Sequence, residues 1–283
     1  PSVSGVNVNA DGPQESGSTT MGNNIAKFGW EIIALSEDFN YHNELVAPLT
    51  NYYNSTPANT EITGVYTDTD GLGLLCSKTY TFQQVGKEAW SESDGDLLGN
   101  LSEDNGADEM INKGYRYFAV TIASGVVIDV YALHMDAASR QVDIDVRNSQ
   151  LTQLATALIK NTKNNKRPVI VMGDTNCRYT REKVKELLID VINAEDGLTI
   201  KDAWIELTRG GLYPQYYGDT SNALSAEIVD KIFYINTTAS DLTLKANTYS
   251  ASDKLEPTDH KPVVVNFTIT DKYGVPVTKS DWQ

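Results

Sequence analysis

The sequence has few cysteines and no long hydrophobic run, and each shortage excludes a class of protein. Cys76 and Cys177 are too few for a disulfide framework and lack metal-binding spacing, so we expect both to be free and structural. No run approaches the length of apolar sequence that spans a membrane, so we expect no stable membrane insertion. The chain starts at Pro1 rather than Met, which favours removal of a leader or tag and a secreted, periplasmic or cell-surface location.

Positive charge is also scarce. The 23 Lys and Arg residues stand against 38 Asp and Glu, which gives a formal net charge of -15. Such a surface repels phosphate polymers and argues against tight, salt-sensitive binding of nucleic acid. A nuclease that binds weakly through a metal ion stays open, because clustered acids are also where a divalent cation binds.

Apolar residues, by contrast, are sufficient for one large core. At 283 residues and 40% hydrophobic content, with no internal repeat and no Pro/Ser linker, we predict a single domain over residues 1–283 and a monomer. Apolar runs and alternation predict strands at 31–36, 72–77, 115–122, 126–133, 169–172, 228–235 and 263–269. Helical spacing predicts helices at 23–28, 151–159 and 184–192, with loops up to Thr20 and over 90–112. Many strands with few helices favour packed sheets with helices outside.

Polar side chains follow the predicted strands at their ends. The apolar run at 169–172 ends at Gly173, with Asp174 and Asn176 just beyond. Taken alone, this is an ordinary Asp/Asn turn before a helix capped by Thr180. The layout recurs, however, at Asn7, Glu37, His134, Asp230, Asp259 and His260. We therefore expect these side chains to converge, although each has a structural explanation on its own.

Converging carboxylates and histidines suit the hydrolysis of a phosphate ester. Mg²⁺ prefers one or two carboxylates plus water and phosphate oxygens, which Glu37 and Asp259 would provide. An attacking water needs a base near neutral pH, and a histidine oriented by a carboxylate is the usual solution. His260 oriented by Asp230 is the candidate pair.

Three further residues would handle the phosphate. Asp174 and Asn176 would orient the water and a phosphate oxygen. His134 would donate a hydrogen bond to the phosphate or a proton to the leaving group, whereas its structural alternative is the capping of a loop.

Five motifs, in order along the chain, carry a resemblance to a known family. They are Glu37 after an apolar strand, the HMDA of 134–137, the GDTN of 173–176, Val229-Asp230 and the TDH of 258–260. The chain resembles the endonuclease/exonuclease/phosphatase superfamily, which includes pancreatic-type deoxyribonucleases, inositol polyphosphate phosphatases and bacterial neutral sphingomyelinases. The resemblance implies an α/β fold, a four-layer sandwich of two mostly antiparallel β-sheets packed face to face with helices outside. It also implies phosphoester cleavage that depends on Mg²⁺, with Mn²⁺ or Ca²⁺ as alternatives.

The resemblance also implies a role for each matching position. Asn7, Glu37 and Asp259 resemble metal-site residues, and Asp174 and Asn176 resemble the residues that hold nucleophile and phosphate. Asp230 resembles the orienting acid and His260 the base.

More narrowly, the motifs look like a secreted bacterial and fungal branch, closer to sphingomyelinase and phospholipase C-like members than to nucleases. His42 and Lys113 are its additional candidate phosphate contacts, although Lys113 is alternatively a solvated turn residue. Arg178, with Arg181, lies beside Asn176 and is the contact that a nuclease would use.

Three substrate classes and one non-enzymatic role follow. The favoured hypothesis is a phosphodiesterase acting on a lipid or small phosphodiester. Its tyrosines at 213, 216 and 217 either touch a membrane interface or form a packed loop, and the packed loop is the preferred interpretation. The alternatives are an endonuclease on DNA or RNA and a phosphomonoesterase on a small sugar or inositol phosphate, with a non-catalytic binding module last.

Overall fold

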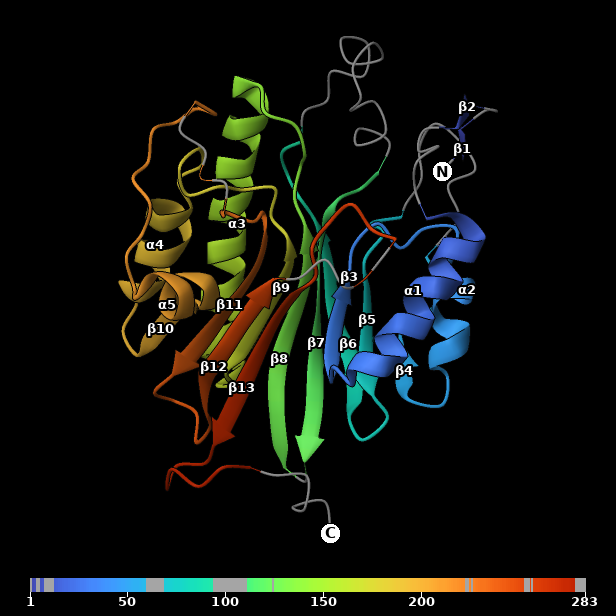
Figure 1. Cartoon of the computed structure of the whole chain (residues 1–283). Helices are drawn as coiled ribbons and strands as arrows, with labels where there is room; N and C mark the ends of the chain where they lie inside the picture. The colour runs from blue at the N-terminus through green and yellow to red at the C-terminus, as the bar shows by residue number, and fades with distance from the viewer. Residues whose placement is uncertain are drawn as a thin grey trace.

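The chain folds into β-sheets that lie between two groups of helices (Figure 1). The structure is a computed structural model that describes residues 13–59, 69–93, 111–123, 125–221, 224, 226–251, 255 and 257–277, and the backbone of 2–3 and 6–7. Within these ranges, none of the helices combines the length and apolar character that a membrane crossing requires.

A six-stranded sheet forms the larger central layer. Its strand order is β10-β11-β9-β8-β7-β6, and its pairs are antiparallel except for the parallel pair of β8 and β9. The strands are β6 (Thr81–Ala89), β7 (Gly114–Ala123), β8 (Val126–His134), β9 (Val169–Asp174), β10 (Leu198–Asp202) and β11 (Asp230–Thr237). Helix α3 (Gln141–Asn165) makes the crossover that a parallel pair needs.

Shorter sheets form the second central layer. One has the order β3-β5-β4 and the other pairs β12 with β13. The strands are β3 (Ile32–Leu35), β4 (Tyr53–Ser55), β5 (Gly73–Ser77), β12 (Thr243–Ala251) and β13 (Val263–Thr270). Separately, β1 (Ser2–Val3) pairs with β2 (Val6–Asn7).

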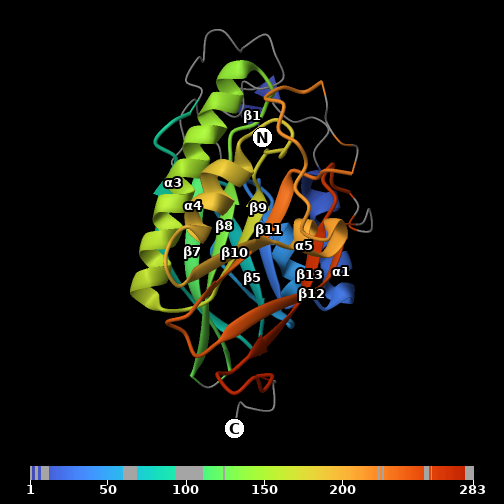
Figure 2. The same cartoon turned by 90° about the vertical axis from the view of Figure 1, so that its left-hand side faces the viewer.

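Three buried clusters show how the layers pack. One joins α3 to one face of the six-stranded sheet, through residues such as Leu154 and Val171. A second joins the opposite face to the smaller sheets, as with Leu74 and Val130. The third packs Ile25 of α1 (Gln14–Phe28) on the outer face of β5. The result is the predicted four-layer sandwich, which Figure 2 shows from the side of α3.

The remaining helices are short. They are α2 (His42–Val46), the 3-10 helix η1 (Ala47–Leu49), the π-helix η3 (Lys185–Ile189), α4 (Asp190–Asn193) and α5 (Ala203–Arg209). Of the predicted helices, the one at 184–192 is therefore split between η3 and α4. Cys76 and Cys177 are free and buried, as expected.

The predicted loop up to Thr20 is wrong, because α1 begins at Gln14. The buried face of this helix includes Gly17, Ser18 and Gly22, so it has no apolar periodicity to detect. A Cβ on Gly22 would lie 2.1 Å from the carbonyl oxygen of Leu45, so only glycine lets α1 approach α2 this closely. Helix α1 ends, as predicted, before Gly29 in the left-handed conformation.

Candidate active site

The site is built at one end of the six-stranded sheet. Asp174, the last residue of β9, is in register with His134 of β8 on one side and with Asp230 of β11 on the other. Gly173 makes this approach possible, since its φ is 145° and a Cβ there would lie 2.0 Å from the carbonyl oxygen of Leu133. Three predicted site residues thus lie side by side on a rigid support.

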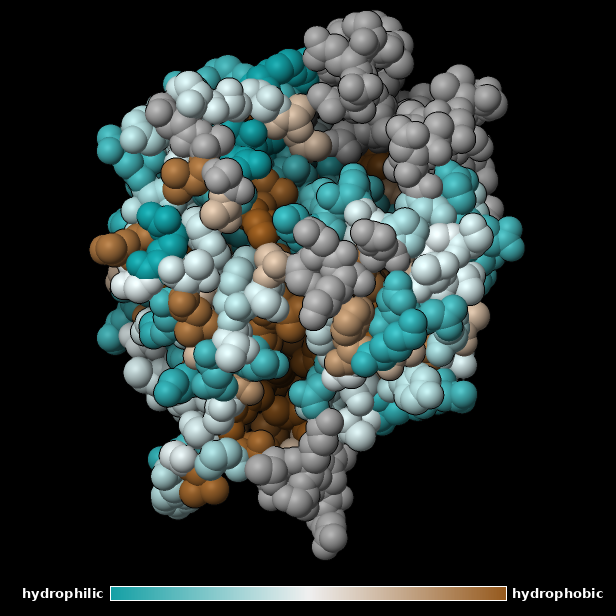
Figure 3. Space-filling view, viewed as in Figure 1, coloured by the Kyte–Doolittle hydropathy of each residue, from teal (hydrophilic) through white to brown (hydrophobic). Residues whose placement is uncertain are grey.

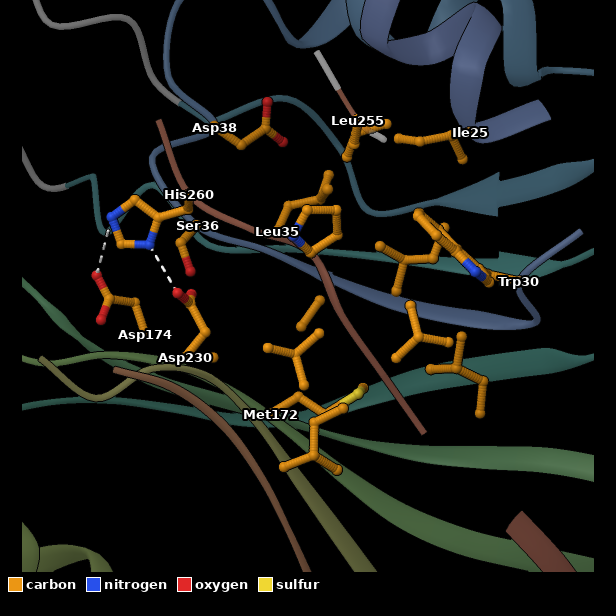
Figure 4. Close-up of a pocket in the computed structure, with 18 of the residues that line it drawn as sticks. Ile25, Trp30, Leu35, Ser36, Asp38, Met172, Asp174, Asp230, Leu255 and His260 are labelled. Atoms are coloured by element: carbon orange, nitrogen blue, oxygen red, sulfur yellow. Dashed lines mark hydrogen bonds and ion pairs between the residues drawn. The ribbon is translucent and has the colours of Figure 1, made fainter. Parts of the chain in front are cut away.

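The Asp174 carboxylate lies between two imidazoles. Its Oδ2 is 3.6 Å from Nε2 of His134 and 4.0 Å from Nε2 of His260. The other ring nitrogen of His260, Nδ1, is 2.7 Å from Oδ2 of Asp230. Figure 4 shows this arrangement, with the His260 ring bridging Asp174 and Asp230. The predicted His260–Asp230 pair is therefore present in the structure.

Asn176 holds Asp174 in place. Its backbone N–H donates to Oδ1 of Asp174 at 2.7 Å, and its Nδ2 donates to Oδ2 at 3.2 Å. The same Nδ2 also donates to the carbonyl oxygen of Met135 at 3.0 Å. Asn176 does this from a left-handed backbone with φ 49°, a conformation that Asn adopts more readily than most other non-glycine residues.

The pKa values of the two histidines of the site are shifted in opposite directions. Burial lowers the pKa of His134 well below its ordinary value, and the charges of Lys113 and His260 lower it further. The hydrogen bond with Asp230 raises the pKa of His260 to about 9, despite partial burial. His134 is therefore neutral at pH 7, which favours its predicted role as a hydrogen-bond donor over that of a proton donor.

Burial also affects Asp174. Burial, followed by the charge of Asp230, raises the pKa of Asp174 to about 6, against the opposing charge of His260. A buried carboxylate near another carboxylate is a typical place for a bound cation, because the cation stabilises the charged form of both.

A divalent cation fits the donors that the site offers. Asp174, Asp230 and His260 each offer one ligand atom, and these atoms lie within 4.8 Å of one another. Carboxylate oxygens with one imidazole are an acceptable ligand set for such an ion. The predicted ligands Glu37 and Asp259 line the same cleft but do not belong to this group of three. The side chain of Asn7, the third predicted ligand, lies outside the described residues.

Glu37 occupies a strained position beside the cleft. Its φ is 59°, which non-glycine residues adopt rarely. The next residue, Asp38, is fixed by its backbone N–H, which donates to the carbonyl oxygen of Gly71 at 2.8 Å. Asp38 also lines the cleft, and the signal for it was an acid directly after Glu37.

His42, Lys113 and Arg178 do not line the cleft, and neither do His134 and Asn176, which lie behind Asp174. His42 is buried with its Nδ1 2.5 Å from Oδ2 of Asp38, and this hydrogen bond raises its pKa. Lys113 is 4% exposed and donates to the carbonyl oxygen of Met135 at 3.2 Å. Arg178 Nη1 donates to the carbonyl oxygen of Glu227 at 2.9 Å. His42, Lys113 and Arg178 are thus placed as supports around the site, and their predicted contacts with substrate remain predictions.

The site opens into a cleft of about 1360 Å³ between β3 and β13. Asp174, Asp230 and His260 lie at one end, and the rest is lined mostly by apolar residues of 32–35 and 263–267. Figure 3 shows the apolar surface as a brown hollow on this face, and Figure 4 shows Leu35 and Met172 beyond the polar group. The cleft is therefore polar at one end and apolar along its length.

The tyrosine-rich loop is partly packed. Tyr213 lies edge-on to Tyr179 with ring centroids 5.3 Å apart, which supports the packed-loop interpretation for this residue. Tyr217, in contrast, is 46% exposed.

Known proteins share sequence and fold with this chain. Residues 32–210, more than half of the chain, match the model of a family described as Endonuclease/Exonuclease/phosphatase family 2. The sphingomyelinase of Mycobacterium tuberculosis is 30% identical over 205 residues, which cover 70% of this chain. The chain spans only about 36% of the length of that relative.

Two solved structures share the fold. Truncated TDP2 of Caenorhabditis elegans superposes with a TM-score of 0.57 at 13% identity, over 91% of this chain and 92% of that one. A mannosyl-6-phosphatase of Bacteroides thetaiotaomicron has the same TM-score at 13% identity, over 88% and 90%. At these identities the likeness concerns the fold alone.

Proposed function

Since the chain belongs to the endonuclease/exonuclease/phosphatase family, whose members are phosphoester hydrolases, we propose that it cleaves phosphodiesters of the sphingomyelin or phospholipid kind. The proposed reaction depends on a divalent cation, with Mg²⁺ preferred, and takes place outside the cell. The observation that carries the proposal is the position of Asp174 between the imidazoles of His134 and His260.

His260 is the proposed general base. In the neutral form of His260, Asp230 accepts a hydrogen bond from Nδ1, and the lone pair on Nε2 is directed to the side of Asp174. Because the pKa of His260 is about 9, this form becomes more populated as the pH rises toward that value. A water molecule between Asp174 and His260 would lose its proton to Nε2 as it attacks phosphorus. The bond from phosphorus to the ester oxygen breaks in the same step, and the leaving alkoxide takes a proton from solvent. The resulting imidazolium is stabilised by Asp230, in the way that the raised pKa of His260 indicates.

His134 and Asn176 are the proposed contacts of the phosphate. A neutral imidazole donates one hydrogen bond without adding a charge, and burial fixes the ring in place. Donors that are already in position stabilise the negative charge that develops on the phosphate oxygens. Asp174 and Asn176 orient each other, so the nucleophile and the phosphate would be held by one rigid unit.

Asp174, with Glu37 and Asp259 of the same cleft, would hold the cation, because Asp230 and the attacking water use the two ring nitrogens of His260. When bound, the cation would polarise a phosphoryl oxygen and offset the charge of the transition state.

Three observations support a lipid phosphodiester over a nucleic acid. The sphingomyelinase of M. tuberculosis acts, by its name, on such a lipid. The cleft has a polar end and an apolar length, as an amphiphilic substrate requires. The net charge of -15 disfavours a polyanion.

The test is hydrolysis of three substrates side by side: sphingomyelin, plasmid DNA and a simple phosphomonoester. We expect release from the lipid only, loss of activity with a chelator, and its recovery with Mg²⁺. His260→Ala should lower turnover by roughly 10²- to 10⁴-fold, the size of a lost general base. Nicking of DNA with intact lipid would overturn the substrate assignment, and an equally active His260→Ala variant would overturn the mechanism.

A further inference from the structure

A chain of buried charges runs behind the candidate site. Arg147 of α3 and Glu182 have no exposed surface, and Arg181 is 7% exposed. Oε1 of Glu182 accepts hydrogen bonds from Nε and Nη2 of Arg147, at 3.0 and 2.7 Å, and from Nε of Arg181 at 2.6 Å. None of the three residues lines the cleft. Only Arg181 was named from the sequence, as a contact beside Arg178 that a nuclease would use.

The two arginines of this cluster also contact the backbone of the site. They share the carboxylate of Glu182, and their remaining N–H groups are satisfied by backbone carbonyl oxygens. Nη1 of Arg147 donates to the carbonyl oxygens of Asp136 at 3.0 Å and of Ala137 at 2.6 Å. These carbonyls belong to the loop that follows His134.

Arg181 contacts a second loop of the site, the one that follows β9 and contains Asn176. Its Nη2 donates to the carbonyl oxygen of Asn176 at 2.6 Å. Glu182 adds a second anchor, because its Oε2 accepts the backbone N–H of Arg178 at 2.7 Å. The two loops also meet directly, since Nδ2 of Asn176 donates to the carbonyl oxygen of Met135.

Two residues in the left-handed conformation lie at the ends of this chain. Asn176 has φ 49° and Ala138 has φ 64°, a conformation that costs more for Ala than for Asn. The Arg181 contact is made to the peptide group of Asn176 itself. Asn176 in turn donates to both carboxylate oxygens of Asp174.

We infer that Arg181, held by Glu182 and Arg147, is a positioning residue of the proposed hydrolase: it fixes the left-handed turn at Asn176 and thereby the orientation of Asp174. This inference rests on the proposed function, because it assigns the cluster a role in the reaction of the same site. Buried ions are weak contributors to stability compared with apolar groups of similar volume, so a role in geometry accounts for their presence here.

The test compares Arg181→Ala with Arg167→Ala. Arg167 is a matched control, because its Nη1 contacts Oδ1 of Asp129 at 3.3 Å at the beginning of β9, the end opposite to Asp174. We expect Arg181→Ala to lower kcat by roughly 10- to 100-fold, as a small displacement of catalytic groups does, with KM little changed. Arg181→Lys keeps the charge but not the planar fork, so its kcat should be intermediate. Arg167→Ala should keep the wild-type kcat.

A second readout does not require activity. The side-chain amide protons of Asn176, followed by NMR, should shift and exchange faster with solvent in Arg181→Ala than in the wild type and in Arg167→Ala. Unchanged Asn176 signals, or the same loss of kcat in both variants, would overturn the inference. If Arg181→Ala does not fold, Arg181→Lys takes its place under the same criteria. A wild type that hydrolyses none of the esters would refute the proposed function, and the amide signals would then decide the positioning role by themselves.

Discussion

His134 and His260 flank the same carboxylate, yet the fold surrounds them in different ways. The side chain of His134 is 2% exposed at the end of β8, and its Nδ1 has no hydrogen-bond partner among the described residues. The side chain of His260 is 43% exposed, follows a loop and is paired with Asp230. The site therefore has two halves. The half around His134 supplies fixed geometry, and the half around His260 and Asp230 supplies a group that changes its protonation state.

The largest expected effects come from removing each histidine in turn. His134→Ala should lower kcat by roughly 10²- to 10³-fold, the cost of one lost donor to a developing charge. It should also lower Tm, because the side chain fills the end of a buried strand. His260→Ala should lose at least as much activity with little change in Tm, since its ring is partly exposed. Thermal melting and steady-state kinetics of both variants provide the measurement.

The opposite result would break the comparison. If His260→Ala has a much lower Tm than His134→Ala, the half of the site around His260 also contributes to the stability of the fold.

The site residues that could be predicted from the sequence are those at the ends of clear strands. Asp174, His134 and Asp230 were identifiable because each ends or begins a strand with a clear apolar run, and strand register brings them together. The four-layer fold followed from the same strands and the family resemblance. The strand β6 was missed because most of its residues are exposed and polar, and β10 and β12 were also missed.

The supports of the site were less predictable. Arg147 lies outside the helix that was predicted at 151–159, and nothing near it in the sequence signals that its side chain pairs with Glu182. His42 was assigned to the substrate from the resemblance alone, whereas its pairing with Asp38 depends on how α2 follows β3. Contacts of this kind arise between segments distant in sequence or from the path of a loop, so local patterns cannot contain them.

Histidine titration by NMR would sharpen the comparison. The protein has three histidines, so His134, His42 and His260 give three assignable signals. In the absence of metal, His260 should titrate near pH 9 because of Asp230, whereas His134 should stay neutral to well below 6.5. Asp230→Asn should bring the His260 midpoint down toward 6.5, the ordinary value.

The raised pKa of His260 determines how the stability of the folded protein depends on pH. The His260–Asp230 pair contributes its full stabilisation below pH 6.5, where the imidazole is protonated in both the folded and the unfolded protein. This contribution is lost as the pH rises from 6.5 through about 9. A His260 midpoint that Asp230→Asn leaves unchanged would remove Asp230 as the cause.

The smallest expected effect is that of replacing Asn7, and it tests whether the Asn7 side chain binds the cation or the phosphate. The resemblance places Asn7 with Glu37 and Asp259 in the cation site, and Asn9 is its matched control two positions further on. An amide oxygen is a weaker cation ligand than a carboxylate, so Asn7→Ala should mainly raise the Mg²⁺ concentration needed for half-maximal activity. Asn9→Ala should leave it unchanged, as titration of both variants with Mg²⁺ would measure. If saturating Mg²⁺ does not restore the rate of Asn7→Ala, its amide acts on the phosphate instead, beside His134 and Asn176 in the half of the site that supplies geometry.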